Sequence, residues 1–175
     1  LGVAVLIIVM SVMNGFRSEL VNKIVGFNSH VVIQSQNESD ERSLLESNYI
    51  KSISKNIIFS NSGEVVLINK NFTKGLSIRG YDVEDFKKLE IFKKINHENK
   101  KDFFIGKNIS IGKELSFDLN LHIGDTILLM SPTGEDTIIG NLPKQESYKI
   151  TSIFDSGLIE FDQNVAFLNI DNLEG

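Results

Sequence analysis

The chain opens with the apolar run Leu1-Gly-Val-Ala-Val-Leu-Ile-Ile-Val-Met-Ser-Val-Met13, and no charged residue appears before Arg17. A helix that is apolar on every side lies either deep inside a protein or in lipid. As a helix, residues 1–16 span roughly 24 Å, somewhat less than the hydrocarbon core of a bilayer at about 30 Å. Because the first residue is Leu1 rather than Met, we expect a piece of a longer protein, and we interpret the run as the end of its first transmembrane helix.

Three other interpretations of this run remain open. A signal peptide is disfavoured, because no basic start and no small-residue cleavage site precede Arg17. A buried core helix and a core strand are both compatible with the Val and Ile content. The next residues favour the membrane, because apolar side chains continue at helical spacing through Phe16, Leu20, Ile24 and Phe27. We therefore predict that residues 1–27 are the end of a transmembrane helix followed by an amphipathic stalk.

The composition of the whole chain limits its function. The chain has 175 residues, of which 41% are hydrophobic and 23% charged, and this predicts a globular domain after the apolar run. The net charge of −5 without a Lys/Arg cluster argues against nucleic-acid binding, which needs a basic surface. The absence of cysteine excludes disulfides and cysteine-based zinc sites.

Residues 28–175 mix short strands with short helices. The expected strands are 30–35, 57–59, 64–69, 76–80, 126–130, 148–154 and 165–170. The expected helices are 43–49, 82–89 with Asp82 as N-cap, 109–119, and a last one capped by Asp171. Turns are expected at 61–63 and 121–125, and a charged, solvated connection at 87–101. Because strands and helices do not alternate regularly, we predict an α+β fold with a split βαβ-type subdomain and a second mixed subdomain.

Catalytic and metal-binding patterns are absent from the sequence. The histidines are His30, His97 and His122, and none has a second ligand at metal-binding spacing. The acidic groups are Asp40-Glu41, Glu84-Asp85 and Asp155 with Glu160 and Asp162, which we interpret as surface carboxylates. No glycine loop ends in Lys-Ser/Thr, so this chain should not hydrolyse ATP, and no serine elbow or cysteine nucleophile is present. We predict a non-catalytic domain without a metal or cofactor of its own.

Three stretches resemble the lipoprotein-releasing permeases, the LolC/LolE family, and within it the LolC type. The first is Ser11-Val-Met-Asn-Gly-Phe16 with Glu19-Leu20 and Ile24, where the first transmembrane helix of that family leaves the membrane. The second is Ile105-Gly106, Ile111-Gly-Lys-Glu-Leu115 and Leu121-His-Ile-Gly-Asp125, a pattern shared with the wider MacB-like periplasmic core. The third is Ile153-Phe-Asp-Ser-Gly157 with Glu160-Phe-Asp162. Together they follow the order of the family over nearly the whole chain.

The resemblance implies a MacB-like periplasmic core domain in residues 28–175 and a place in the bacterial inner membrane. It implies an ABC-transporter permease that extracts lipoproteins from the membrane and hands them to a periplasmic carrier. The partners so implied are a LolD-like ATPase holding ATP and Mg, a second permease that is LolE-like or a copy of this chain, a LolA-like carrier, and the lipoprotein. ATP binding and hydrolysis on that ATPase would close the two permeases and press the acyl chains toward the carrier.

In the LolC type, a protruding loop called the hook recruits the carrier. Its counterpart here is residues 132–147, where Ile138-Ile-Gly-Asn-Leu-Pro-Lys144 is similar to the apolar, Gly- and Pro-containing hook tip. The resemblance thus assigns carrier binding to Ile138, Ile139, Gly140, Asn141, Leu142, Pro143 and Lys144. The sequence departs from the usual tip because Ile138-Ile139 stands where a Pro precedes the Gly. A hairpin tip folded onto its own domain is the alternative.

Met13 and Phe16 lie where the family's lipid-binding cavity opens between the permeases, so the resemblance implies contact with acyl chains. Contact with bulk lipid or with the underside of the domain is equally compatible with their apolar character. Other protein classes also stay open: a MacB-type efflux permease, which should carry a longer insertion, and a division-type regulatory permease, which should lack the block from Phe154 to Asp162. A soluble enzyme would need a pocket of converging titratable groups.

Overall fold

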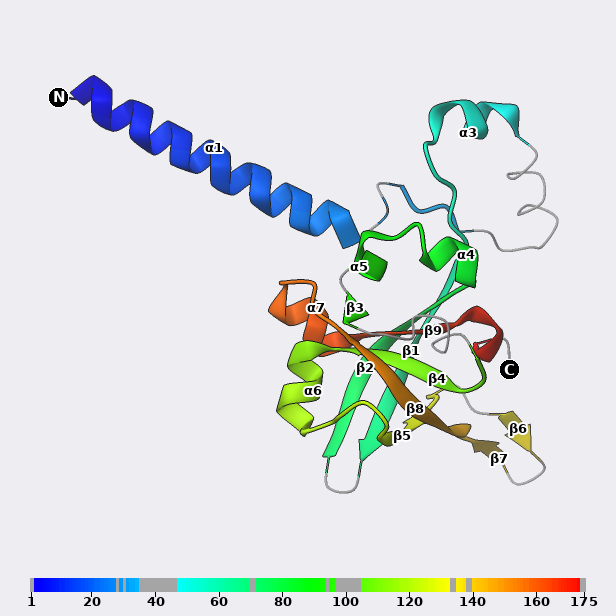
Figure 1. Ribbon diagram of the computed structural model, residues 1–175. Helices are drawn as coiled ribbons and strands as arrows, with labels where there is room; N and C mark the ends of the chain where they lie inside the picture. The colour runs from blue at the N-terminus through cyan, green and yellow to red at the C-terminus, as the bar shows by residue number, and fades with distance from the viewer. Residues whose placement is uncertain are drawn as a thin grey trace. The chain divides into compact units, whose positions relative to one another are not determined.

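The computed structural model describes residues 2–27, 29, 31–34, 47–69, 72–93, 95–96, 105–132, 135–137 and 140–173 (Figure 1). The chain divides into two compact units, Leu1–Ile57 and Ile58–Gly175. Each unit is treated by itself below. The predicted division of the chain after residue 27 stays a prediction.

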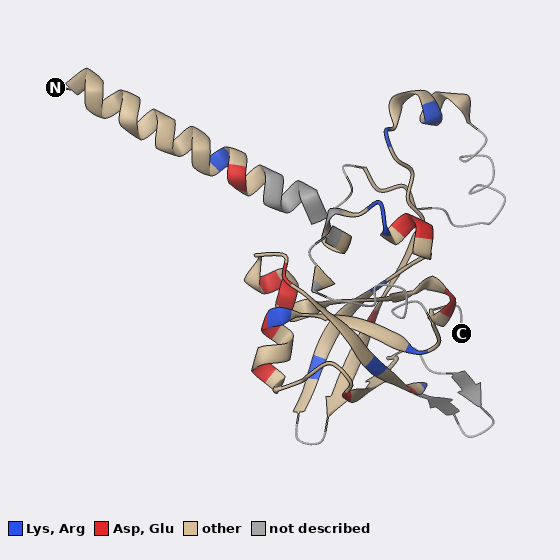
Figure 2. Cartoon of the chain, in the orientation of Figure 1, with Lys and Arg blue, Asp and Glu red and all other residues tan. Residues whose placement is uncertain are grey.

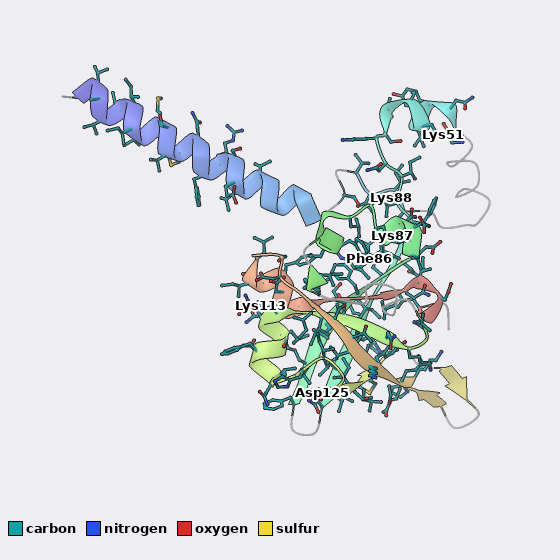
Figure 3. All side chains as sticks on the ribbon, viewed as in Figure 1. Lys51, Phe86, Lys87, Lys88, Lys113 and Asp125 are labelled. Atoms are coloured by element: carbon teal, nitrogen blue, oxygen red, sulfur yellow. The ribbon has the colours of Figure 1, made fainter. Side chains whose placement is uncertain are left out.

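The first unit is dominated by the helix α1, Gly2–Phe27. Its stretch Gly2–Val21 is 20 residues long, is apolar enough to cross a membrane, and has none of its surface buried. Charged side chains are confined to the part of α1 nearer its C-terminal end (Figure 2). The side chains of residues 2–21 of α1 point outward all around the helix (Figure 3), as expected for a helix whose neighbours are lipid or other chains.

One prediction for the first unit was wrong. The strand expected at 30–35 is irregular at residues 31–34, where Val31, Val32 and Ile33 are exposed. Strand propensity is realised only against a neighbouring strand, and no described strand lies against these residues. The helix expected at 43–49 lies mostly outside the described residues and stays a prediction; the helix α3, Asn48–Ile53, begins near its end.

The second unit is built around a sheet that closes on itself. Its described strands are β1 (Ser60–Asn69), β2 (Phe72–Tyr81), β3 (Ile95–Asn96), β4 (Asn108–Gly112), β5 (Thr126–Met130), β8 (Gln145–Phe154) and β9 (Val165–Asn169). They follow the order β3-β8-β4-β9-β2-β1-β5, and β5 pairs in turn with β8. Residues 145–149 of β8 pair with β5, whereas residues 149–154 of the same strand pair with β4. The long strand β8 thus closes the other strands into a small barrel.

Apolar side chains fill the barrel because they alternate along every strand of the ring. The core comprises Val65, Leu67, Leu76, Ile78, Ile109, Ile111, Ile127, Leu129, Tyr148, Ile150, Ala166 and Leu168 from the strands. Leu115 of helix α6 (Lys113–Leu119) and Leu121 after it join the same cluster. The mixed helix and strand content agrees with the predicted α+β class.

A second, aromatic core covers the other face of the sheet. Its rings are Tyr81, Phe86, Phe92, Phe154, Phe161 and Phe167, with neighbouring centroids 5.0–6.2 Å apart. They come from strands β2, β8 and β9 and from the short helices α4 (Val83–Phe86), α5 (Glu90–Lys93) and α7 (Ile159–Asn164). Figure 3 labels Phe86, the last residue of α4, whose side chain is completely buried. Each face of the sheet therefore has its own apolar cover.

Several local predictions for this unit were confirmed. The strands at 64–69, 76–80, 126–130, 148–154 and 165–169 are present, and β1 and β2 form the expected antiparallel pair. Asp82 caps α4, since its carboxylate accepts a hydrogen bond from the backbone of Val83. The turn at 121–125 is held by the backbone N–H of Asp125, which donates to the carbonyl of His122 at 3.1 Å.

Other local predictions were wrong. Residues 57–59 are irregular, and the turn expected at 61–63 is the straight interior of β1, because β2 pairs with each of these residues. Residues 109–112 are strand β4 rather than helix. The expected loop 87–101 contains α5 and β3, with Ile91 and Ile95 buried. The last helical turn is the 3-10 helix η2, Ile170–Asn172, and Asn169 rather than Asp171 caps it.

Candidate functional site: a hairpin arm and its ionic root

The predicted hook segment continues the barrel wall as a two-stranded arm. After the pairing of Met130 with Gln145, the backbone N–H of Ser131 donates to the carbonyl of Lys144 at 2.9 Å. Beyond that bond, β6 (Glu135–Thr137) and β7 (Gly140–Leu142) pair antiparallel as a separate small ladder. Figure 1 shows β6 and β7 extending past the ends of β5 and β8. The predicted hook segment 132–147 therefore has two parts: residues 145–147 belong to the barrel strand β8, and the arm before them is rooted in that strand.

The structure places the predicted carrier-binding residues along this arm. Ile138 and Ile139 lie outside the described residues, between β6 and β7 in the sequence. Gly140, Asn141 and Leu142 form β7, and their side chains are not among those described. Pro143 is exposed, and Lys144 is partly buried at the root of the arm.

A cluster of polar side chains surrounds the root of the arm. We call Lys107, Lys144, Glu146 and Tyr148 the root cluster. One carboxylate oxygen of Glu146 lies 3.1 Å from the Lys107 Nζ and 3.6 Å from the Lys144 Nζ. The hydroxyl of Tyr148 donates to the other oxygen at 2.9 Å. The carboxylate of Glu146 thus accepts contacts from two chain segments.

The electrostatics of the root cluster keep Glu146 ionised. Burial by itself would raise the pKa of Glu146, but hydrogen bonds from Lys107 and Tyr148 and the charges of Lys107 and Lys144 outweigh it and lower that pKa. Burial, followed by the hydrogen bond to the Glu146 carboxylate, raises the pKa of the Tyr148 hydroxyl. At neutral pH, the cluster therefore holds an ionised Glu146 and a neutral Tyr148.

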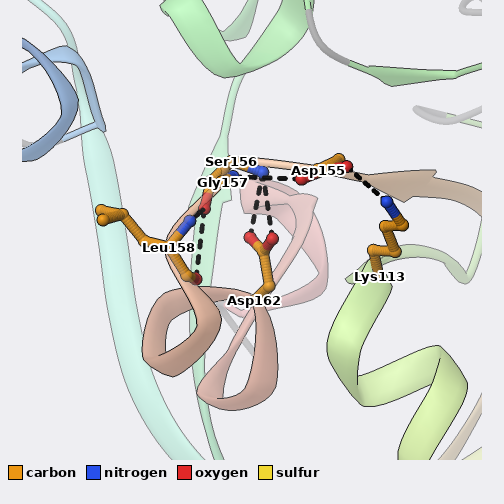
Figure 4. Close-up of polar contacts among 6 residues, drawn as sticks. All are labelled: Lys113, Asp155, Ser156, Gly157, Leu158 and Asp162. Atoms are coloured by element: carbon orange, nitrogen blue, oxygen red, sulfur yellow. Dashed lines mark hydrogen bonds and ion pairs between the residues drawn. The ribbon is translucent and has the colours of Figure 1, made fainter.

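A second polar group lies at α7 and joins two of the motifs quoted above (Figure 4). The buried carboxylate of Asp162 accepts from the backbone N–H of Ser156, with both oxygens at 3.1 Å. Lys113 reaches across from α6 to Asp155 at 2.7 Å. Burial raises the pKa of Asp162, and the hydrogen bonds from Ser156 oppose that shift. We call Asp155, Ser156, Gly157, Leu158 and Asp162 the clasp.

The clasp is packed against the backbone of Gly112. A Cβ atom at Gly112 would lie 2.0 Å from the carbonyl oxygen of Asp162, which leaves room only for glycine. The backbone N–H of Leu158 donates to the Ser156 hydroxyl at 3.0 Å, and that of Gly157 to Asp155 at 3.1 Å. These contacts join the strand β4 and the helix α6 to the segment before α7, so we interpret the clasp as a structural joint.

The remaining candidate residues are dispersed. Met13 and Phe16 are each 61% exposed on α1, within the stretch long enough to span a membrane. His122 is exposed, and its ring lies 3.8 Å from Asp125 (Figure 3 labels Asp125). His30 and His97 lie outside the described residues. Among the side chains that the structure describes, no three of His, Asp and Glu converge as metal ligands would.

Sequence reasoning missed the root cluster. Glu146 and Tyr148 are two residues apart on a strand, so their common face could have been inferred. The approach of Lys107, from a segment 39 positions earlier, carries no sequence signal, because it depends on the parallel pairing of β4 with β8. Lys107 and Glu146 are 39 positions apart in the sequence.

Comparison with known proteins gives relatives over nearly the whole chain. No family model matches. The lipoprotein-releasing system transmembrane protein LolC of Neisseria meningitidis serogroup B is 27% identical over 179 residues, which cover 98% of this chain and 42% of the relative. LolC of Buchnera aphidicola from Schizaphis graminum is 29% identical over 177 residues, covering 98% of this chain and 43% of the relative.

A third LolC, from Xylella fastidiosa strain Temecula1, is 23% identical over 189 residues, covering 99% of this chain and 43% of the relative. The chain is LolC-like. This confirms the resemblance inferred from the three motifs. The LolC-like chain spans less than half the length of these curated relatives, with 42–43% covered.

Proposed function

We propose that this LolC-like chain is part of an ABC-transporter permease for lipoprotein release, and that its hairpin arm docks the periplasmic carrier. The observation that carries the proposal is the arm itself, a β-hairpin that continues the barrel wall beyond its last rung. A hairpin that projects from a closed barrel offers its edges and tip to a partner, whereas the barrel strands are already paired with one another.

The helix α1 supports a membrane location for the same protein. Its stretch Gly2–Val21 is long and apolar enough to span the bilayer. We propose that it anchors the chain in the bacterial inner membrane, with the barrel in the periplasm as a MacB-like core. Met13 and Phe16 would then contact the acyl chains of the lipoprotein, where each buried methylene contributes about 0.8 kcal/mol.

The chemistry of transport belongs, in this proposal, to partner subunits. A LolD-like ATPase would bind ATP and Mg, and a second permease, LolE-like or a copy of this chain, would complete the pathway. The chain itself contributes docking and mechanical coupling. Its clasp and its root cluster are each held by internal hydrogen bonds and ion pairs, which suits a rigid element that transmits motion.

The test is a binding measurement on the full chain held in detergent micelles. Surface plasmon resonance would measure the affinity of a LolA-like carrier for the wild type and for Ile139→Asp and Leu142→Asp. Phe117→Asp is the matched control, because Phe117 is 83% exposed on α6, away from the arm. Charge at an apolar docking residue should weaken binding at least tenfold, or about 1.4 kcal/mol.

The binding measurement has three outcomes that lead to different conclusions. Binding that is lost in both arm variants and retained in the control would support carrier docking on the arm. Equal loss in the control variant would mean that the carrier docks elsewhere on the barrel. No wild-type binding at high carrier concentration would reject carrier docking by this chain and favour the LolE-like, efflux or division-type roles.

A further inference from the structure

The root cluster connects the arm to two segments that are remote from it in the sequence. Lys107 precedes β4 and reaches Glu146 on β8 with its ammonium group. The hydroxyl of Tyr148 lies between Glu146, at 2.9 Å, and the carbonyl of Asn172 in η2, at 3.4 Å. The side-chain amide of Asn172 donates in turn to the carbonyl of Gly106 at 3.0 Å. These contacts close a ring of three segments around the base of the arm.

The cluster lies beside the junction between the β5–β8 ladder and the β6–β7 ladder. The backbone bond from Ser131 to Lys144 lies in that junction. A two-stranded hairpin is marginally stable by itself, so its direction depends on what holds its base. Glu146 is the first inward-facing residue of β8 after that bond, and Lys144 on the same face also approaches its carboxylate.

The strengths of the contacts differ with burial. Tyr148 is only 4% exposed, so its hydrogen bond to the Glu146 carboxylate is sheltered and charge-assisted. The side chain of Lys107 is 54% exposed, so its ion pair is partly screened by solvent. The phenol should therefore hold the carboxylate in place, and the two lysines should add a weaker, salt-sensitive contribution.

We propose that Glu146 is a positioning residue, whose contacts with Tyr148 and Lys107 fix the direction of the hairpin arm before a partner docks. As far as the carrier is concerned, the inference rests on the function proposed above. A rigid arm loses less conformational entropy on docking than a mobile one, so fixing the arm should raise carrier affinity. Glu146 does not touch the partner in this scheme. It acts on affinity through the arm.

The experiment uses the full chain in micelles and two independent readouts. Amide hydrogen exchange of residues 131–145 reports the motion of the arm without any carrier, and surface plasmon resonance reports carrier affinity. The variants are Glu146→Gln, Tyr148→Phe and Lys107→Gln, together with the double variant Glu146→Gln/Lys107→Gln. Glu84→Gln is the matched control, since it removes a 2.8 Å ion pair with Lys87 on α4.

We expect exchange of the arm amides to rise about fivefold in Glu146→Gln and in Tyr148→Phe, and carrier affinity to fall by a similar factor, equivalent to about 1 kcal/mol. The effects of Glu146→Gln and Lys107→Gln should be less than additive, because both remove the same contact. In 1 M salt, exchange of the wild-type arm should approach that of Lys107→Gln. The control should match the wild type in both readouts.

Unchanged arm exchange in Glu146→Gln and Tyr148→Phe would overturn the inference, as would faster exchange without loss of affinity. If the barrel of one variant were destabilised, faster exchange in its β1 and β2 amides would reveal it, and the other variant would decide. Absence of carrier binding by the wild type would reject the proposed docking alone, because the exchange readout needs no carrier.

Discussion

Gly112→Ala is the sharpest test of how the barrel is joined to α7. A Cβ at position 112 would lie 2.0 Å from the carbonyl oxygen of Asp162, whereas ordinary contact starts at 3.4 Å. Both contacting parts are backbone, so no side chain can rotate away, and the two segments would have to separate by about 1.4 Å, the difference between these distances. That movement would pull Asp162 from the backbone N–H of Ser156, which it now contacts at 3.1 Å.

The two costs can be added. Overpacking in a closely packed place costs roughly 1–3 kcal/mol, and a buried carboxylate that loses its donor costs roughly 1–3 kcal/mol more. We expect Gly112→Ala to lower the free energy of unfolding by about 3 kcal/mol, which for a unit of this size lowers Tm by roughly 10 °C.

The assay is urea unfolding of the full chain in micelles, followed by near-ultraviolet circular dichroism of the aromatic core. Gly75→Ala is the control, because a Cβ at that position of β2 meets nothing within 4 Å. It should change stability by less than about 0.5 kcal/mol. A Gly112→Ala protein that unfolds at the same urea concentration as Gly75→Ala and wild type would refute the close approach of β4 to α7.

Three further predictions follow from individual contacts. Asp82→Ala should destabilise the second unit by about 1 kcal/mol in the same urea assay, because the cap of α4 at the backbone of Val83 is lost. Burial raises the pKa of Asp162, so the stability contribution of that carboxyl is complete below its unfolded pKa and is lost as pH rises through its folded pKa. Asp162→Asn should remove this dependence of stability on pH, and a slope of stability against pH that is unchanged between pH 3 and 7 would contradict the assignment. The pKa of Glu146 is lowered, so its contribution to the free energy of unfolding is present above the unfolded pKa and is lost as pH falls through the folded pKa. Glu146→Gln should therefore be less stable than the wild type at pH 7 and equally stable at pH 2.5. A difference in stability that persists at pH 2.5 would show that the charge of Glu146 is not the cause.

The sequence predicted those parts of the fold that local patterns determine. Alternating apolar residues identified β5 and most of β8 and β9, and the Asp82 cap followed from a rule about helix starts. The turn expected at 61–63 failed because β2 supplies cross-strand partners that override local turn chemistry. In 109–119, Ile111 and Leu115 lie at helical spacing, yet they come from a strand and the helix after it. Both side chains enter the same core, so their spacing carried no information about the backbone between them.

Closure of the barrel was beyond sequence reasoning for a similar reason. It requires β8 to pair with β5 along one half and with β4 along the other, with an irregular register between Ile109 and Ser110. Long-range pairing of this kind depends on the whole set of strands. The root cluster could not be predicted for the same reason, because Lys107 approaches Glu146 only when β4 and β8 are paired. Residues 132–147, by contrast, were singled out by the resemblance of their tip to the hook, and their hook role stays a prediction.

The second and third family motifs have a structural role, which differs from the docking role proposed for the arm. The second motif contains Gly112 and Lys113, and the third contains Asp155 and Asp162. In three dimensions these are the two halves of one joint, in which Gly112 packs against Asp162 and Lys113 pairs with Asp155. Substitutions at such a joint should disturb the barrel, so these positions are explained by packing and say nothing about carrier docking. The docking proposal depends on residues 138–144, where the sequence departs from the usual hook tip, and this is why binding by arm variants, rather than further sequence similarity, decides the function of the chain.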